Sequence, residues 1–256
     1  MSRLSSLAKV VRPLLLAGIA ALALSACASN RGQLGNTDHG GIAASQGQSS
    51  LAELTERYRR NPRDRNVVIN YAAALRAAGQ SGQAAAALEQ AITYSPNDVE
   101  IRIAYAKALT ANGRFDQSLG VLDGVIRPDA PDWNALMVKG ATLDQMGQND
   151  QARALYAQAA VMAPGEASIE TNMGLSYAMS NDLVTAEKHL RRAVQMRGAT
   201  SQTRQNLALI VGLQGRFGEA KAIYAAELPP DQVESNMLYV RAMLTQQNRW
   251  DLIAKN

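Results

Sequence analysis

Apolar residues recur through most of this chain at intervals of three or four, which is the spacing of one face of an α-helix. The stretch from Trp133 to Glu166 shows the pattern best, and it predicts two short helices joined at Gly147 and ended near Pro164. A glycine suits the joint because the residue after a helix often has left-handed backbone, which glycine adopts without a Cβ clash. The pattern therefore predicts a helix–turn–helix unit.

The unit recurs at a constant interval of about 34 residues, so equivalent positions can be followed through the chain. The turn position holds, in chain order, Gly79, Gly113, Gly147, Asn181 and Gly215. Small residues recur once on the first helix and once on the second helix of each unit. These two rows are Ala72, Ala106, Gly140, Gly174 and Ala208, and Ala84, Ser118, Ala152, Ala186 and Ala220. Because small side chains let helices approach closely, we expect the helices of each unit to cross at these rows.

Larger residues at two further equivalent positions are expected to fill the space around each crossing. They are Leu75, Leu109, Leu143, Tyr177 and Val211 on the first helices, and Leu88, Leu122, Tyr156, Leu190 and Tyr224 on the second. The second helices are predicted to end near Pro96, Pro164 and Gly198, and Pro128 is predicted to shorten the one in the second unit.

A helix–turn–helix unit with this period resembles the tetratricopeptide repeat (TPR). The resemblance spans five units over residues 65–230 and implies an all-α fold, a right-handed α-solenoid of TPR helix–turn–helix repeats. A terminal unit must differ from the others because one of its faces meets water. We therefore expect residues 51–64, with a helix over Leu51–Arg60, to cap one end, and residues 231–256 to cap the other.

The C-terminal capping region is predicted to contain a helix over Asp231–Gln246, with Asp231 as its N-cap. Its apolar stripe consists of Val233, Met237, Val240, Met243 and Leu244. The segment Trp250–Leu252 resembles the start of another short second helix.

Residues 1–26 have the pattern of a secretory signal peptide: basic residues, then an apolar run over Leu14–Ala26 that ends in small residues. The run is shorter than the roughly 20 residues that span a bilayer. Its end, Leu24-Ser25-Ala26-Cys27, resembles the lipobox of bacterial lipoproteins, in which the thiol is lipidated and the chain is cut before the cysteine. The alternative is an ordinary signal peptide with a chance cysteine. Because the sequence has a single cysteine, an intramolecular disulfide is excluded, and we interpret Cys27 as the site of acylation.

Residues 27–50 follow as the lipidated Cys27 and a tether rich in Ser, Gly, Gln and Asn, whose composition predicts flexibility. In the sorting rule of bacterial lipoproteins, an Asp after the cysteine retains the protein in the inner membrane. Ala28 stands at that position, so the resemblance implies an outer-membrane protein that is held by palmitate and other acyl chains and faces the periplasm.

Charge and reactive residues exclude several classes of function. The chain has 26 basic and 22 acidic residues, and three basic residues leave with the signal peptide, so the mature chain has a net charge of +1. The basic residues between Arg57 and Arg65 are interspersed with acidic ones, which favours a solvated helix face over a nucleic-acid site. Two histidines, His39 and His189, cannot form a metal cluster, and no phosphate loop or nucleophile motif is present. We expect no cofactor, no small-molecule substrate and no enzymatic activity.

A stack of TPR units without a catalytic site indicates a scaffold that binds a protein partner. In TPR stacks the first helices line the concave side, which implies a partner groove of apolar and neutral residues suited to an extended or helical segment. The predicted groove residues are Asn66, Ile69, Ala73, Ile103, Lys107, Met137, Ala141, Thr171, Leu175, Gln205 and Leu209. We expect Met137 and Leu209 to be partly exposed there. The alternative is that the convex face or the C-terminal cap makes the contact.

Over nearly all of the mature chain, the sequence resembles the TadD-like TPR lipoproteins of the Tad/Flp (tight adherence) pilus assembly system. The most specific part lies in residues 205–217, Leu228–Asp231 and Tyr239–Leu244. The resemblance implies a role in secretin assembly or localisation, with the pilus secretin or another component of the Tad machinery as partner. Two alternatives remain: a TPR regulatory arm of a cell-wall or glycan enzyme, and a lipoprotein of outer-membrane protein assembly.

Overall fold

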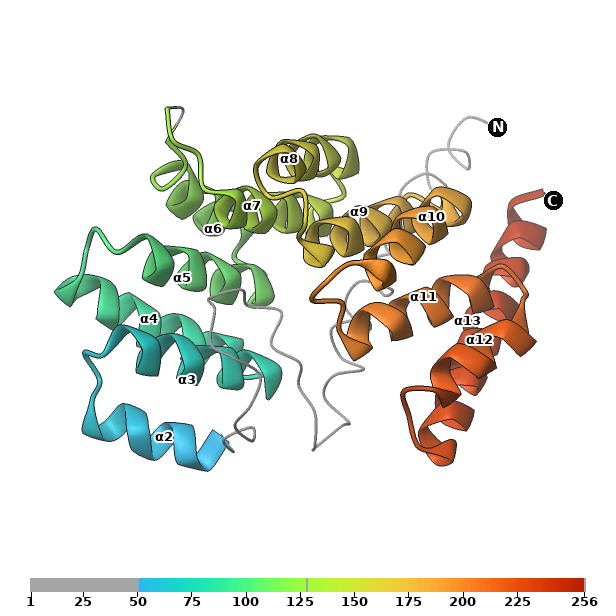
Figure 1. Cartoon of the computed structure of the whole chain (residues 1–256), viewed down its shortest axis with the longest axis horizontal. Coiled ribbons are helices and arrows are strands. Elements are labelled where there is room, and N and C mark those ends of the chain that lie inside the picture. The colour runs from blue at the N-terminus through green and yellow to red at the C-terminus, as the bar shows by residue number, and fades with distance from the viewer. Residues whose placement is uncertain (1–50, 128, 256) are drawn as a thin grey trace. The chain divides into compact units, whose positions relative to one another are not determined.

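The computed structural model describes residues 51–127 and 129–255, and within these ranges the backbone forms twelve α-helices and no β-strand (Figure 1). The all-α fold class predicted from helical periodicity is therefore confirmed. The predicted signal peptide, the lipidation site Cys27 and the tether lie outside the described residues.

The helices group into two compact units, one ending at Ala163 and the other beginning at Pro164. The N-terminal unit contains α2 (Leu51–Arg60), α3 (Arg65–Ala77), α4 (Ser81–Tyr94), α5 (Val99–Ala111), α6 (Phe115–Asp123), α7 (Trp133–Gln145) and α8 (Asn149–Met162). The C-terminal unit contains α9 (Ala167–Met179), α10 (Leu183–Gln195), α11 (Ser201–Leu213), α12 (Phe217–Ala225) and α13 (Pro230–Lys255). From α3 to α12 the helices form five consecutive pairs, and the first helices α3, α5 and α7 pack side by side, as do α9 and α11.

The two helices of each pair are joined by a residue with left-handed backbone, as the sequence predicted. The φ angle is 63° at Asn181 and lies between 74° and 82° at the four glycines of the same row. At Asn181 the helix closes with a hydrogen bond from the Asp182 N–H to the Tyr177 carbonyl at 2.9 Å, which satisfies one of the last free carbonyls of α9. Asparagine tolerates this conformation, so it replaces glycine without changing the turn.

Aspartates cap three of the first helices, a recurrent feature that apolar periodicity alone does not reveal. Asp64, Asp98 and Asp132 occupy the same position in successive repeats and precede α3, α5 and α7. Each carboxylate accepts a hydrogen bond from the backbone N–H three residues further on, at 3.0, 3.0 and 2.9 Å. Each cap satisfies a backbone donor that has no partner within the helix, and its negative charge lies at the positive end of the helix dipole.

The crossing between α7 and α8 shows why small residues recur at fixed positions. Ala152 is fully buried, and the Tyr156 ring packs against Gly140 so closely that a Cβ on Gly140 would lie 2.5 Å from Tyr156 Cε1. The ring is held in place because its hydroxyl donates a hydrogen bond to Asp144 Oδ2 at 2.9 Å. The large Tyr156 ring on the second helix thus fits because Gly140 on the first helix has no side chain.

The C-terminal capping region differs from its prediction. Instead of a helix over Asp231–Gln246 and a further short one at Trp250, a single helix, α13, begins at Pro230 and continues to Lys255. Asp231 lies in its first turn and is not the N-cap. The physical reason is that residues 231–256 contain neither glycine nor proline, so nothing in the backbone interrupts the helix. The predicted apolar stripe is confirmed, since Val233, Met237 and Val240 are buried against α11 and α12.

The close contact between Gly140 and Tyr156 predicts that Gly140→Ala destabilises the protein by about 1–3 kcal/mol, because the added methyl group overpacks the crossing. Gly120 provides the matched control, since it is exposed in α6 and a Cβ there would have no heavy atom within 4 Å. Gly120→Ala should raise stability by about 0.5–1 kcal/mol through the better helix propensity of alanine. Urea unfolding of the two variants measures both changes, and equal effects would contradict the role of the crossing.

Candidate functional site

The predicted groove residues all lie on first helices, but they differ in how much surface they offer. Asn66 is exposed, and six others are partly exposed. These six are Ile69, Ala73, Lys107, Ala141, Leu175 and Gln205. They present a mixed apolar and neutral surface with one lysine. Whether a partner binds there remains a prediction.

The remaining four groove residues are buried, so the expectation of partial exposure is wrong for Met137 and Leu209. Their exposed fractions are 6% and 8%, and those of Ile103 and Thr171 are 2% and 9%. Thr171 donates a hydrogen bond to the Ala167 carbonyl at 2.8 Å and lies 3.3 Å from the Thr203 hydroxyl, so its polar atom is occupied within the unit. These four positions contribute to packing rather than to a binding surface.

The burial of Leu209 follows from the position of its helix. Every residue from Asn206 to Leu213 in α11 is buried, because α9, α10, α12 and α13 all pack against this one helix. A periodicity argument assigns one face of a first helix to the groove and assumes that the face is open. In α11 the neighbouring helices cover that face as well. The number of neighbours around a helix is a tertiary property that its own sequence does not fix.

The described residues contain neither a metal cluster nor a helix that could span a membrane. They contain no group of three or more His, Cys, Asp or Glu side chains that could hold a metal ion. None of their helices combines the length and the apolar character that crossing a bilayer requires. His189 stacks on Tyr177, with ring centroids 5.3 Å apart, and its Nδ1 lies 2.8 Å from the Glu170 carboxylate. That contact connects α10 to α9, which gives this histidine a structural role.

A charged network ties α10 to the turn between α11 and α12. The Glu187 carboxylate accepts hydrogen bonds from Gln214 Nε2 at 2.8 Å and Arg191 Nε at 2.7 Å, and it also pairs with Arg216. Partial burial raises the pKa of Glu187, but the hydrogen bonds from Arg216, Gln214 and Arg191 outweigh it, so the pKa is lowered overall. Both arginines also pair with Glu219, and the network therefore stabilises the turn that precedes α12.

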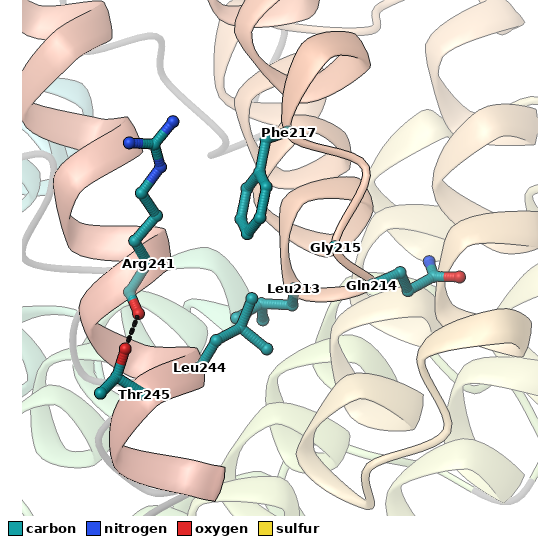
Figure 2. Close-up of a pocket in the computed structure, with 7 residues that line it drawn as sticks. All are labelled: Leu213, Gln214, Gly215, Phe217, Arg241, Leu244 and Thr245. Carbon is teal, nitrogen blue, oxygen red and sulfur yellow. Dashed lines mark hydrogen bonds between the residues drawn. The ribbon is translucent and has the colours of Figure 1, made fainter.

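A pocket of about 600 Å³ lies between this turn and α13 in the C-terminal unit (Figure 2). It is lined by Leu213, Gln214, Gly215, Phe217, Arg241, Leu244 and Thr245. In Figure 2 the side chains of Leu213 and Leu244 approach each other from opposite sides. The Arg241 side chain extends opposite Phe217, with its guanidinium carbon 5.4 Å from the ring centroid. The amide of Gln214 points away from α13, toward its partner Glu187.

The pocket has a mixed lining, with three large apolar side chains, two neutral polar ones and one cation. Arg241 is exposed and forms no ion pair with the described side chains, and its carbonyl accepts a hydrogen bond from the Thr245 hydroxyl at 2.9 Å. This combination suits a ligand that presents an apolar group beside a negative charge. From the sequence, the C-terminal cap was predicted only as a possible contact surface. The pocket was not predicted, because it forms only where α13 packs against the end of α11 and the start of α12.

Comparison with known families and structures identifies the fold. Family models of the tetratricopeptide repeat match residues 75–141 and 138–201. The structure is similar to that of a thermophilic TPR protein from Thermus thermophilus, with a TM-score of 0.60 and 22% identity over 70% of this chain and 98% of that chain. It is also similar to PilW, a widely conserved type IV pilus biogenesis factor (TM-score 0.56, 16% identity, 72% and 87% coverage). A third similar structure is a TPR protein from Parabacteroides merdae (TM-score 0.50, 14% identity, 73% and 76% coverage).

A comparison with curated proteins gave no match. At these identities, the similarity to solved structures shows the fold alone. The family matches and the structural similarity together confirm that the chain carries TPR repeats and has an all-α TPR fold. This fold typically serves as a scaffold for protein–protein interaction rather than as a catalytic framework.

Substitution of two equivalent leucines tests which of the predicted groove residues are exposed. Leu175 and Leu209 occupy the same repeat position on α9 and α11, but Leu175 is partly exposed and Leu209 is buried. Leu209→Glu should cost about 3–5 kcal/mol, because it places an unpaired charge in the core, whereas Leu175→Glu should cost about 1 kcal/mol or less. Thermal melting separates the two variants. Equal melting temperatures for the two variants would contradict the finding that Leu209 is buried and Leu175 is partly exposed.

The lowered pKa of Glu187 predicts a pH-dependent contribution to stability. A carboxylate with a lowered pKa stabilises the fold above the ordinary glutamate pKa of about 4.3, and the contribution disappears as the pH falls through the lowered value. Glu187→Gln should therefore destabilise the protein by about 1 kcal/mol at pH 7 and by less at pH 3. Urea unfolding at both pH values measures the difference in unfolding free energy between the wild type and the variant. Glu234→Gln, at an exposed position of α13, is the control. A free-energy difference that does not change with pH would contradict the role given to the charged network around Glu187.

Proposed function

We propose that this chain is a lipid-anchored TPR scaffold of the outer membrane that faces the periplasm and helps the secretin of a Tad/Flp pilus system to assemble or localise. It acts by binding a protein partner and not by catalysis. The anchor is Cys27, and the tether over residues 27–50 gives the repeats freedom to reach the partner.

The observation that carries the proposal is the position of the residues in which the chain resembles Tad pilus lipoproteins. Residues 205–217 cover most of α11 and the turn into α12, Leu228–Asp231 lead into α13, and Tyr239–Leu244 lie in α13. The first and the last of these stretches supply six of the seven residues that line the pocket in Figure 2. Part of the specific resemblance therefore lies around one pocket of the C-terminal unit. The similarity in fold to PilW, a type IV pilus biogenesis factor, supports a role in pilus assembly.

Replacement of the proposed anchor should separate localisation from folding. Cys27→Ser should abolish labelling with radioactive palmitate and leave an unprocessed or soluble protein, because a multiply acylated cysteine is the proposed attachment to the membrane. In the bacterium that carries this protein, we expect fewer secretin multimers in the outer-membrane fraction. Membrane fractionation and immunoblotting for the secretin measure both effects, and the wild-type chain should co-purify with the secretin.

The outcomes distinguish the alternatives. A Cys27→Ser variant that still fractionates, fully processed, with the outer membrane would contradict the anchor. Loss of β-barrel proteins in general, with the secretin affected no more than the rest, would favour outer-membrane protein assembly instead. Co-purification of a cell-wall or glycan enzyme in place of the secretin would favour the regulatory arm.

A further inference from the structure

The last helix of the structure, α13, occupies the place of a first helix in a sixth unit. It packs against α11 and α12, as α11 packs against α9 and α10. The row of small residues on first helices continues into it, because Ala242 lies one repeat after Ala208. The two alanines differ in environment: Ala208 is fully buried, and Ala242 is exposed.

Ala242 belongs to one face of α13 that is exposed along its length. Leu238, Arg241, Ala242 and Thr245 follow helical spacing and lie on one side of the helix; we call them the α13 face. All four are exposed, and Leu238 is a large apolar side chain that is 66% exposed. Three residues of α13 that line the pocket can be compared with the residues one repeat earlier in α11, whose exposed fractions are 4% or less. These residues are Leu207, Ile210 and Val211, equivalent to Arg241, Leu244 and Thr245.

Three positions of the α13 face, Arg241, Ala242 and Thr245, are thus positions that neighbouring helices cover in the preceding unit, whereas Arg204, the residue equivalent to Leu238, is partly exposed. Within the described part of the chain, no second helix follows α13 to cover them. The face has two features that select an occupant. Ala242 permits the close approach of a helix, and Arg241 offers a positive charge that no described carboxylate neutralises.

We propose that the α13 face and the adjoining pocket bind an amphipathic helix of the partner protein, which packs on α13 as the second helix of a sixth unit would. One apolar side chain of that helix enters the pocket between Phe217 and Leu244, and an acidic side chain pairs with Arg241. The apolar contact supplies affinity, and the ion pair sets the register of the bound helix. The inference deepens the proposed function, on which it rests, by assigning the partner to this surface instead of to the groove of first helices.

Site-specific photo-crosslinking in the bacterium that carries this protein tests the location. A photoreactive amino acid replaces Leu238 in the full-length chain, and a second strain carries it at Val184, a matched apolar residue that is 74% exposed on α10. We expect an adduct that reacts with antibody against the secretin from position 238 and none from position 184. Absence of the adduct at 238, or an adduct with a second copy of this chain, overturns the proposed binding to the α13 face.

The same strains separate this inference from the proposed function. A secretin adduct from Val184 alone leaves the pilus role standing and overturns the α13 face. Secretin multimers that persist unchanged when the protein is deleted, without an adduct at either position, overturn both.

Charge exchange tests the chemistry of the contact. Synthetic peptides covering the crosslinked segment of the secretin are titrated against the purified full-length protein, and binding is followed by fluorescence anisotropy. Arg241→Glu should weaken binding by about tenfold or more, whereas Lys221→Glu, the same charge change at an exposed position of α12, should alter it less than about twofold. A peptide in which the acidic residue is replaced by lysine should recover affinity for the Arg241→Glu protein. Equal effects of the two variants, or no recovery, overturn the ion pair.

Discussion

The close crossing of paired helices is the constraint on which the rest of this structure depends. Small residues at the point of contact let the two helices of a pair approach closely, because the distance between packed helices depends on the side chains between them. Gly140 and Tyr156 show how strict the requirement is, because the space that a methyl group would occupy is already filled by a ring whose hydroxyl is held by Asp144. The left-handed turns fix where the first helices end, and aspartate caps fix where α3, α5 and α7 begin, so that the small residues meet.

Repetition of this crossing also determines where surface remains. Each helix inside one of the two compact units is covered by the helices before and after it. The extreme case is α11, in which every residue from Asn206 to Leu213 is buried. A helix at the end of the described stack keeps one face open. In α13 that face carries Arg241 and Leu238 beside a pocket, so the same packing rule that builds the core also leaves a surface with both charge and apolar area.

Periodicity predicted the repeated part of the fold well because its determinants are local. The turn at Asn181, the small residue at Gly140 and the short helix α6 each depend on residues within one unit, and each has the predicted form. The groove was predicted less well, since Met137 and Leu209 are buried although their helical register placed them on a binding face. Exposure depends on how many other helices pack around a residue, and register within one helix does not contain that information.

The sequence by itself determined the all-α class, the repeating helix–turn–helix unit, the positions of the turns and the rows of contact between paired helices. It did so because backbone conformation and side-chain size act over a few residues. Only the tertiary structure showed that Phe217 and Arg241 face each other across one pocket, and that α13 continues unbroken as the cap. The pocket arises from the packing of α13 against α11 and α12, which places residues far apart in the chain on one surface. Such a surface is a property of the assembled helices and of no single repeat.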